Sequence, residues 1–171
     1  MLLKALAKYK ATFCYISFII IINYSYPYFP FITIAHAPFS SGDMVIGIIY
    51  VLRDFAQREI KHYVILAMLF GAGISYLLAD KSMAIASLCS FMVGEFIDWG
   101  IFTFTGKPLS QRLLWSSAIS APIDSIVFLA IYGPFNFAGI SVISFSKLLG
   151  VLLLWYMWRR RLRSVAINAM A

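Results

Sequence analysis

Six apolar stretches, each close to the length of a membrane crossing, take up most of this chain of 171 residues. A transmembrane helix needs about 20 consecutive and mainly apolar residues. Short breaks that contain proline, glycine or charged residues separate the stretches. The stretches lie near residues 11–30, 41–60, 62–79, 82–104, 111–132 and 139–158.

The composition excludes a water-soluble domain. Hydrophobic residues make up 62% of the chain and charged residues 12%, whereas a soluble domain has about 25% charged residues. Within lipid, only helices and closed barrels pair all of their backbone groups, and the stretches lack the two-residue alternation of barrel strands. We therefore predict an all-α fold in which residues 1–171 form one integral membrane bundle of six transmembrane helices.

The basic residues predict the orientation of the bundle. If the N-terminus is placed inside, eleven lysines and arginines fall in cytoplasmic segments and only Lys81 falls outside. This bias follows the positive-inside rule, so both termini are predicted to be cytoplasmic. The net charge of +7 then reflects topology and contact with lipid headgroups, and no nucleic acid is expected as a partner. The cytoplasmic set consists of Lys4, Lys8, Lys10, Arg58, Lys61, Lys107, Arg112, Arg159, Arg160, Arg161 and Arg163.

The first stretch is predicted to be a retained helix and not a signal peptide. Ala35-His36-Ala37 has the small-residue pattern of a cleavage site. However, the apolar run before it is long, the pattern lies far downstream of that run, and Pro38 follows directly.

Six ionisable side chains lie well inside the predicted helices. Charged groups at this depth are costly and normally face the protein interior or a wet cavity. Four acids accompany two bases, so pairing alone cannot neutralise them all. Either a carboxylate is protonated, or a ligand or cation completes the set. The six residues are Arg53, Asp54, Glu95, Asp98, Asp124 and Lys147.

Helical spacing brings several of these groups together. Glu95 and Asp98 are three residues apart, and Arg53 and Gln57 are four apart, so each pair shares one helix face. Counted along the helices, the groups occupy one slab near mid-membrane, where transporters commonly bind their substrates. The predicted substrate-binding residues are Arg53, Asp54, Gln57, Glu95, Asp98, Asp124, Ser125 and Lys147.

Structural roles are the alternative for the same residues. Asp54 precedes Arg58 by four residues and could pair with it near the inner interface. Arg53 could extend toward the inner headgroups. A buried network of the acids with Arg53 and Lys147 could fix how the helices pack.

Other local features favour a cavity. Pro122, just before Asp124, frees a backbone carbonyl inside its helix, which is tolerated where the backbone lines a cavity. Gly94, beside Glu95, allows close approach of another helix or a ligand. The middle helix of each half carries a mid-span aspartate, Asp54 and Asp124, which predicts a 3+3 inverted repeat.

Polar residues ordered along successive helices resemble a known family. Between about residues 40 and 150, the chain is similar to the VUT family of vitamin uptake or queuosine-precursor transporters. The resemblance implies six helices in a multi-pass protein of a bacterial-type cytoplasmic (inner) membrane, and import of 7-deazaguanine precursors of the tRNA base queuosine. Longer members carry an acidic Glu-Val-Tyr-Gly-like segment where this chain has RDFAQ at residues 53–57, so the chain resembles a short branch. The matching residues are 51–59 (VLRDFAQRE), His62, Ser75-Tyr76, 84–87 (AIAS), 95–98 (EFID) and Asp124-Ser125.

The polar residues suit such a substrate. A 7-deazaguanine presents adjacent ring N–H and amino donors, which a carboxylate such as Glu95 or Asp98 accepts in bidentate fashion. Its carbonyl needs a donor such as Arg53, Gln57 or Lys147. We therefore expect an importer, and no enzyme, that lies in the lipid bilayer and binds a small, flat, 7-deazaguanine-like molecule at mid-membrane.

Two other functions stay open. A substrate-binding membrane subunit of an energy-coupling-factor vitamin importer also has about six helices, and Ala7 and Ala11 would suit docking on a coupling helix. An intramembrane aspartyl enzyme is less favoured, because Asp43 lies far in depth from Asp98. The sequence has no nucleotide-binding loop or metal-ligand pattern, so no cofactor and no metal are expected. A homodimer or an energy-coupling partner is left open.

Overall fold

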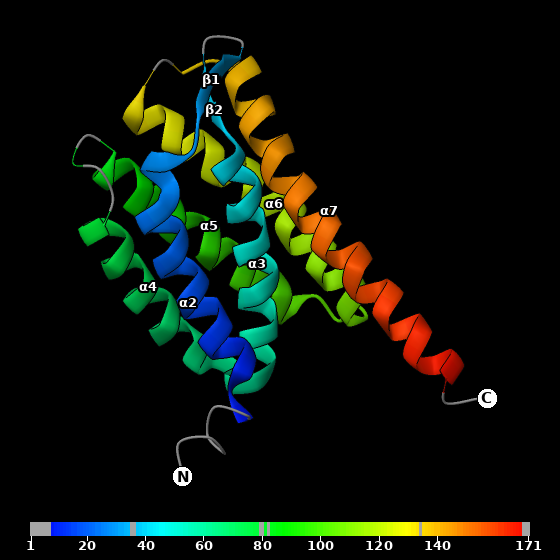
Figure 1. Ribbon diagram of the computed structural model, residues 1–171. Coiled ribbons are helices and arrows are strands. Elements are labelled where there is room, and N and C mark those ends of the chain that lie inside the picture. Colours follow the sequence, from blue (N-terminus) through cyan, green and yellow to red (C-terminus); the bar gives the residue numbers. More distant parts are fainter. Residues whose placement is uncertain (1–7, 35–36, 79–80, 82, 134, 169–171) are drawn as a thin grey trace.

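The computed structural model describes residues 8–34, 37–78, 81, 83–133 and 135–168. Helices make up almost all of this part of the chain, with one short β-hairpin (Figure 1). Lys4, Ala7, Ala35 and His36, which entered the predictions above, lie outside the described residues. The elements in order are α2 (Lys10–Ser25), η1 (Tyr26–Tyr28), β1 (Phe31–Ile34), β2 (Ala37–Ser40), α3 (Ser41–Ile60), η2 (Lys61–Tyr63), α4 (Val64–Leu78), α5 (Ala84–Phe104), α6 (Leu109–Tyr132) and α7 (Phe137–Asn168).

Helices occupy the predicted stretches, but several ends differ. α3 has the predicted bounds, whereas α2 ends at Ser25 instead of residue 30, and α7 continues to Asn168 instead of ending at 158. The start of α2 and the end of α7 lie at the same end of the bundle, opposite the hairpin (Figure 1). Six crossings and the cytoplasmic placement of both termini stay predictions. Among the described residues, four segments are long and apolar enough to cross a membrane: Ser41–Leu78, in which α3 and α4 count as one, Ala84–Phe104, Leu109–Tyr132 and Phe137–Arg161.

The last part of the first predicted helix is a 3₁₀ turn, η1, and the hairpin follows it in the break predicted between residues 30 and 41. Pro27 in η1 and Pro30 after it have no backbone N–H with which to continue the helix. β1 then pairs antiparallel with β2, with Phe31 opposite Ser40. The Ser40 side chain accepts a backbone N–H of the first turn of α3, and Asp43 Oδ2 accepts the Ser40 N–H at 3.0 Å. Because Ser40 is both the last residue of β2 and the N-cap of α3, the hairpin is joined directly to α3.

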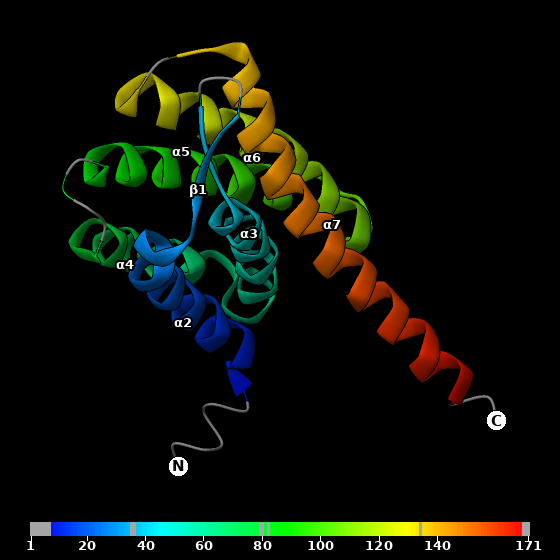
Figure 2. The same ribbon diagram turned by 45° about the horizontal axis from the view of Figure 1, so that its top comes forward.

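α3 lies at the centre of the bundle, as the rotated view in Figure 2 also shows. It packs against α2 on one side and α7 on the other, while α5 packs between α4 and α6. Buried apolar side chains of α2, α3 and α4, among them Ile19 and Met68, form one core cluster. Those of α3, α5, α6 and α7, among them Val51 and Leu113, form a second cluster. α3 therefore contributes to both cores.

Two glycines make the close crossing of α3 and α7. A Cβ atom at Gly47 would overlap the backbone carbonyl of Lys147, and a Cβ atom at Gly150 would overlap the backbone carbonyl of Met44. Small residues allow helix backbones to approach this closely inside a membrane. Because the two contacts are reciprocal, they fix the position of Lys147 along α3.

A carboxylate from α3 holds the beginning of α2. Glu59 Oε1 accepts the Ala11 backbone N–H at 2.9 Å, and Glu59 Oε2 accepts the Thr12 backbone N–H at 2.9 Å and the Thr12 hydroxyl at 3.1 Å. Backbone N–H groups in the first turn have no partner within their helix, and negative charge is favourable there.

We expect Glu59→Gln to lower the free energy of unfolding by about 1 kcal/mol, because the amide accepts fewer of these bonds and carries no charge. Thermal unfolding in detergent measures the change. Thr12→Val removes only the hydroxyl contact and should have the smaller effect. A wild-type unfolding temperature for Glu59→Gln would show that the contact does not stabilise α2.

Candidate functional site

One face of α3 carries buried polar side chains at helical spacing. Asp43, Tyr50, Asp54 and Gln57 follow one another at intervals of seven, four and three residues, which places them along one side of the helix. All four are buried, as is Arg53 beside them. A central helix with such a face needs polar partners from its neighbours, because unpaired polar groups are costly in the interior.

The Arg53 side chain is fully buried among three carboxylates, and these four residues are called the Arg53 cluster below. Arg53 Nη1 lies 2.9 Å from Asp54 Oδ1, Nε lies 3.5 Å from Glu95 Oε2, and Nη2 contacts Asp98 Oδ2. Nη1 also donates to Gln57 Oε1 at 2.6 Å. The cluster joins α3 to α5 and holds three acid groups for one guanidinium.

Hydroxyl groups from α2 and α6 complete the surroundings of the Arg53 cluster. The Tyr15 hydroxyl donates to Glu95 Oε2 at 3.0 Å, and the Ser116 hydroxyl donates to Asp54 Oδ2 at 3.2 Å. Glu95 Oε1 is buried and accepts no hydrogen bond from any residue in the described part of the chain. A buried acceptor without a donor costs free energy, so Glu95 has the capacity to accept a donor from a ligand.

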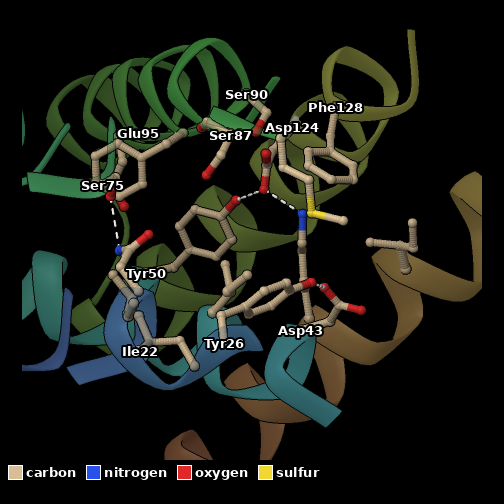
Figure 3. Close-up of a pocket in the computed structure, with 17 residues that line it drawn as sticks. Ile22, Tyr26, Asp43, Tyr50, Ser75, Ser87, Ser90, Glu95, Asp124 and Phe128 are labelled. Atoms are coloured by element: carbon tan, nitrogen blue, oxygen red, sulfur yellow. Dashed lines mark hydrogen bonds and ion pairs between the residues drawn. The ribbon is translucent and has the colours of Figure 1, made fainter. Parts of the chain in front are cut away.

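A second cluster consists of Tyr50, Asp124 and Lys147, and is called the Lys147 cluster. Lys147 Nζ lies 2.6 Å from Asp124 Oδ2, and the Tyr50 hydroxyl donates to the same oxygen at 2.5 Å (Figure 3). The cluster joins α3, α6 and α7. Gly94 makes room for it, because a Cβ atom there would lie 2.9 Å from the Asp124 Cβ and 3.1 Å from the Tyr50 hydroxyl oxygen.

The two clusters meet at a cavity of about 340 Å³, to which all six helices α2–α7 or the turns next to them contribute. Three carboxylates, one ammonium group and the rings of Tyr26, Tyr50, Phe91 and Phe128 line it, together with apolar side chains and several hydroxyl groups. Figure 3 shows Tyr26 beside Asp43 and Tyr50 beside Asp124. The Tyr26 hydroxyl donates to Asp43 Oδ1 at 3.1 Å, and the Tyr50 hydroxyl donates to Asp124. The charged residues of the wall are Asp43, Glu95, Asp124 and Lys147.

The structure divides the predicted site residues into two groups. Glu95, Asp124 and Lys147 line the cavity. The others do not, and the Ser125 hydroxyl donates instead to the Ala121 carbonyl at 2.8 Å within its own helix. The residues outside the cavity wall are Arg53, Asp54, Gln57, Asp98 and Ser125.

The structural alternatives for α3 are also resolved. Asp54 pairs with Arg53 on its own helix and with Ser116, not with Arg58. Arg53 is 0% exposed and therefore does not extend to the membrane surface. Its contacts match the buried network that was the third alternative, although Glu95 belongs to both this network and the cavity.

Sequence reasoning did not select Tyr15, Tyr26, Asp43 or Tyr50. A signal existed for Asp43 and Tyr50, because both share the face of α3 that carries Asp54. The sequence prediction for Asp43 is only that it lies far in depth from Asp98. Tyr15 and Tyr26 carried no such signal, because tyrosines near helix ends are common at membrane interfaces.

Comparisons with known proteins bear on residues 66–165, which match the family described as "Putative vitamin uptake transporter". The match covers 100 of the 171 residues. It includes Glu95, Asp98, Asp124 and Lys147 and leaves out the polar face of α3. No curated protein and no solved structure matches the chain in the same comparisons. With four segments able to cross a membrane, the chain is a multi-pass membrane protein, and it belongs to the vitamin uptake transporter family.

Proposed function

We propose that the protein imports a small, flat, polar molecule of the 7-deazaguanine type, bound in the cavity between the Arg53 and Lys147 clusters. The observation that carries the proposal is the wall of this cavity, in which carboxylates, an ammonium group and aromatic rings face one space of about 340 Å³. Small-molecule sites have volumes of about 300–1,000 Å³, so this cavity suits a ligand with one small ring system.

The polar groups of the wall match the edges of such a ring. Glu95 Oε1 has no donor among the described residues, and the adjacent N–H and amino groups of a 7-deazaguanine would supply one. Lys147 Nζ donates to Asp124 and keeps further hydrogens for the carbonyl of the ligand. Phe91 and Phe128 offer aromatic surface for the flat face.

The remaining predicted residues then have a supporting role in this proposal. Arg53 contacts Glu95 Oε2 from behind the cavity, and Asp54 and Asp98 contact Arg53 in turn. These contacts hold the Glu95 carboxylate in one orientation, as groups behind a binding site commonly do. Asp98, the other candidate carboxylate, positions Arg53 in this arrangement.

We expect Glu95→Gln to weaken binding of 7-deazaguanine derivatives about ten- to a hundredfold, because one charge-assisted hydrogen bond is worth roughly 1.5–3 kcal/mol. Calorimetric titration of the purified protein in detergent measures the affinity. Glu59→Gln is the matched control, since it removes the same charge far from the cavity and should keep wild-type affinity. Phe128→Ala, which lies outside both charge clusters, should also weaken binding and tests the cavity independently of them.

Wild-type affinity in both Glu95→Gln and Phe128→Ala would exclude the cavity as the binding site. Uptake of labelled 7-deazaguanines by cells that carry only this chain tests import directly. Binding of another flat vitamin in their place would keep the site and change the substrate. Uptake that requires a copurifying ATPase would support the energy-coupling alternative, for which Ala7, one of the two predicted docking residues, lies outside the described residues.

A further inference from the structure

A second depression lies at the other end of α3 from the hairpin, and it is distinct from the substrate cavity. Its volume is about 240 Å³ and none of its lining residues lines the larger cavity. The end of α3, η2, the end of α5 and the beginning of α6 form its walls. It is called the basic pocket below, because its wall includes Arg58, Lys61, His62 and Arg112.

The charge of the basic pocket is not neutralised by neighbouring acids. No carboxylate lines it, and within the described ranges no ion pair joins any of its basic side chains to an acid. Glu59, the acid next to Arg58 in the chain, is bonded to the beginning of α2. Two arginines, one lysine and one histidine therefore surround a space whose lining residues include no acid.

The pocket is also built, and is more than a group of surface lysines and arginines. The Arg112 guanidinium stacks on the Phe102 ring, with its Cζ atom 4.8 Å from the ring centroid. Arg112 Nε is buried and has no hydrogen-bond partner among the residues described. Gln57, in the floor, donates to Thr103 Oγ1 at 2.8 Å and accepts from Arg53 at 2.6 Å. Hydrogen bonds thus hold the Gln57 side chain in the wall of the pocket. The Arg112 Nε–H, in the same wall, has no acceptor among the described residues.

We propose that the basic pocket binds a phosphate group, either the headgroup phosphate of an anionic phospholipid or free phosphate. Arginine and lysine are the side chains that bind phosphate oxygens, and the guanidinium edge gives parallel hydrogen bonds. The pocket lies where α3 and α5 end and α6 begins, so it sits at headgroup depth at the end of the bundle that is predicted to be cytoplasmic. Basic pockets between helices at that depth bind anionic headgroups.

The test measures binding of phosphatidylglycerol and of phosphatidylcholine to the full-length protein in detergent by native mass spectrometry, with inorganic phosphate as competitor. The wild type should bind one phosphatidylglycerol in preference to phosphatidylcholine. Arg58→Gln combined with Arg112→Gln should weaken that binding about ten- to thirtyfold, because each basic residue close to an anionic headgroup raises the affinity several-fold. Arg160→Gln removes an exposed charge of α7 outside the pocket and should leave binding unchanged.

A third variant guards against loss of folding. Lys61 has a φ of 53° and a ψ of −130°, a region that glycine adopts without steric cost, so Lys61→Gly should fold normally and still bind phosphatidylglycerol less tightly. Lipid binding that inorganic phosphate does not displace would identify the lipid as the source, and displacement together with direct phosphate binding would identify free phosphate. Wild-type lipid preference in both the double variant and Lys61→Gly, or binding of neither probe, would overturn the proposal.

Discussion

Replacement of Arg53 by methionine is expected to lower the free energy of unfolding by about 3–5 kcal/mol, the cost of removing one partner from a buried ion pair. Arg53 is the one base of the Arg53 cluster and contacts the carboxylates of Asp54, Glu95 and Asp98. Without it, three buried acid groups would lie together with no positive charge among them. Thermal or denaturant-induced unfolding in detergent measures the loss.

Two further variants separate charge from packing at this position. Arg53→Lys keeps the charge and gives up the planar set of donors, so it should fall between methionine and the wild type. Asp98→Asn added to Arg53→Met removes one of the unpaired acids and should restore part of the lost stability. Arg160→Met, at an exposed position, should change stability by less than about 0.5 kcal/mol. Equal stability of Arg53→Met and Arg160→Met would show that the cluster does not depend on the guanidinium charge.

The second large effect is expected at the crossing of α3 and α7. Gly47→Ala places a methyl group against the backbone carbonyl of Lys147, where neither helix can give way by turning a side chain. We expect a loss of about 3 kcal/mol, the upper end of the usual range for overpacking. Because Lys147 moves with its backbone, its contact with Asp124 should also weaken, and ligand affinity should fall together with stability.

Glycines elsewhere in the bundle supply controls of the same chemistry. A Cβ atom at Gly73 in α4 or at Gly100 in α5 would have no neighbour within 4 Å. Alanine is the better helix former by about 1 kcal/mol, so Gly73→Ala and Gly100→Ala should keep or raise stability. Gly47→Ala should therefore lower the stability, whereas Gly73→Ala and Gly100→Ala should not. A Gly47→Ala protein as stable as Gly73→Ala would mean that the close crossing is not required.

The extent to which the fold was predictable differs along the chain. Hydropathy located the helices, and the bounds of α3 agree with the prediction because Ser40 caps its start and a 3₁₀ turn follows its end. The hairpin was missed, because residues 31–40 fall between two predicted helices and the short apolar run 31–34 (FITI) does not by itself predict a strand. Hydropathy measures burial in lipid or protein and does not distinguish an apolar strand from an apolar helix of the same length.

The site was predictable as a set of residues but not as an arrangement. The cost of burying a charged side chain predicted six site residues. Glu95, Asp124 and Lys147 line the cavity, and Arg53, Asp54 and Asp98 do not. Spacing along one helix shows which side chains share a face, but it does not show which neighbouring helix that face meets. The pairing of Lys147 with Asp124 joins α7 to α6 beside Tyr50 of α3, and two glycines permit the close approach of α7 to α3.

The unequal lengths of the helices have a consequence for the surrounding lipid. α2 and α4, which lie side by side, have 16 and 15 residues, so they reach about 24 and about 22 Å, less than the roughly 30 Å of the hydrocarbon core. α7, on the other side of the bundle, has 32 residues and reaches about 48 Å. If α2 and α4 cross the membrane as predicted, the acyl chains beside them must compress, while α7 must tilt or extend into water. The protein should accordingly thin the bilayer along one edge only, and membranes of shorter-chain lipids should accommodate that edge at the lowest elastic cost.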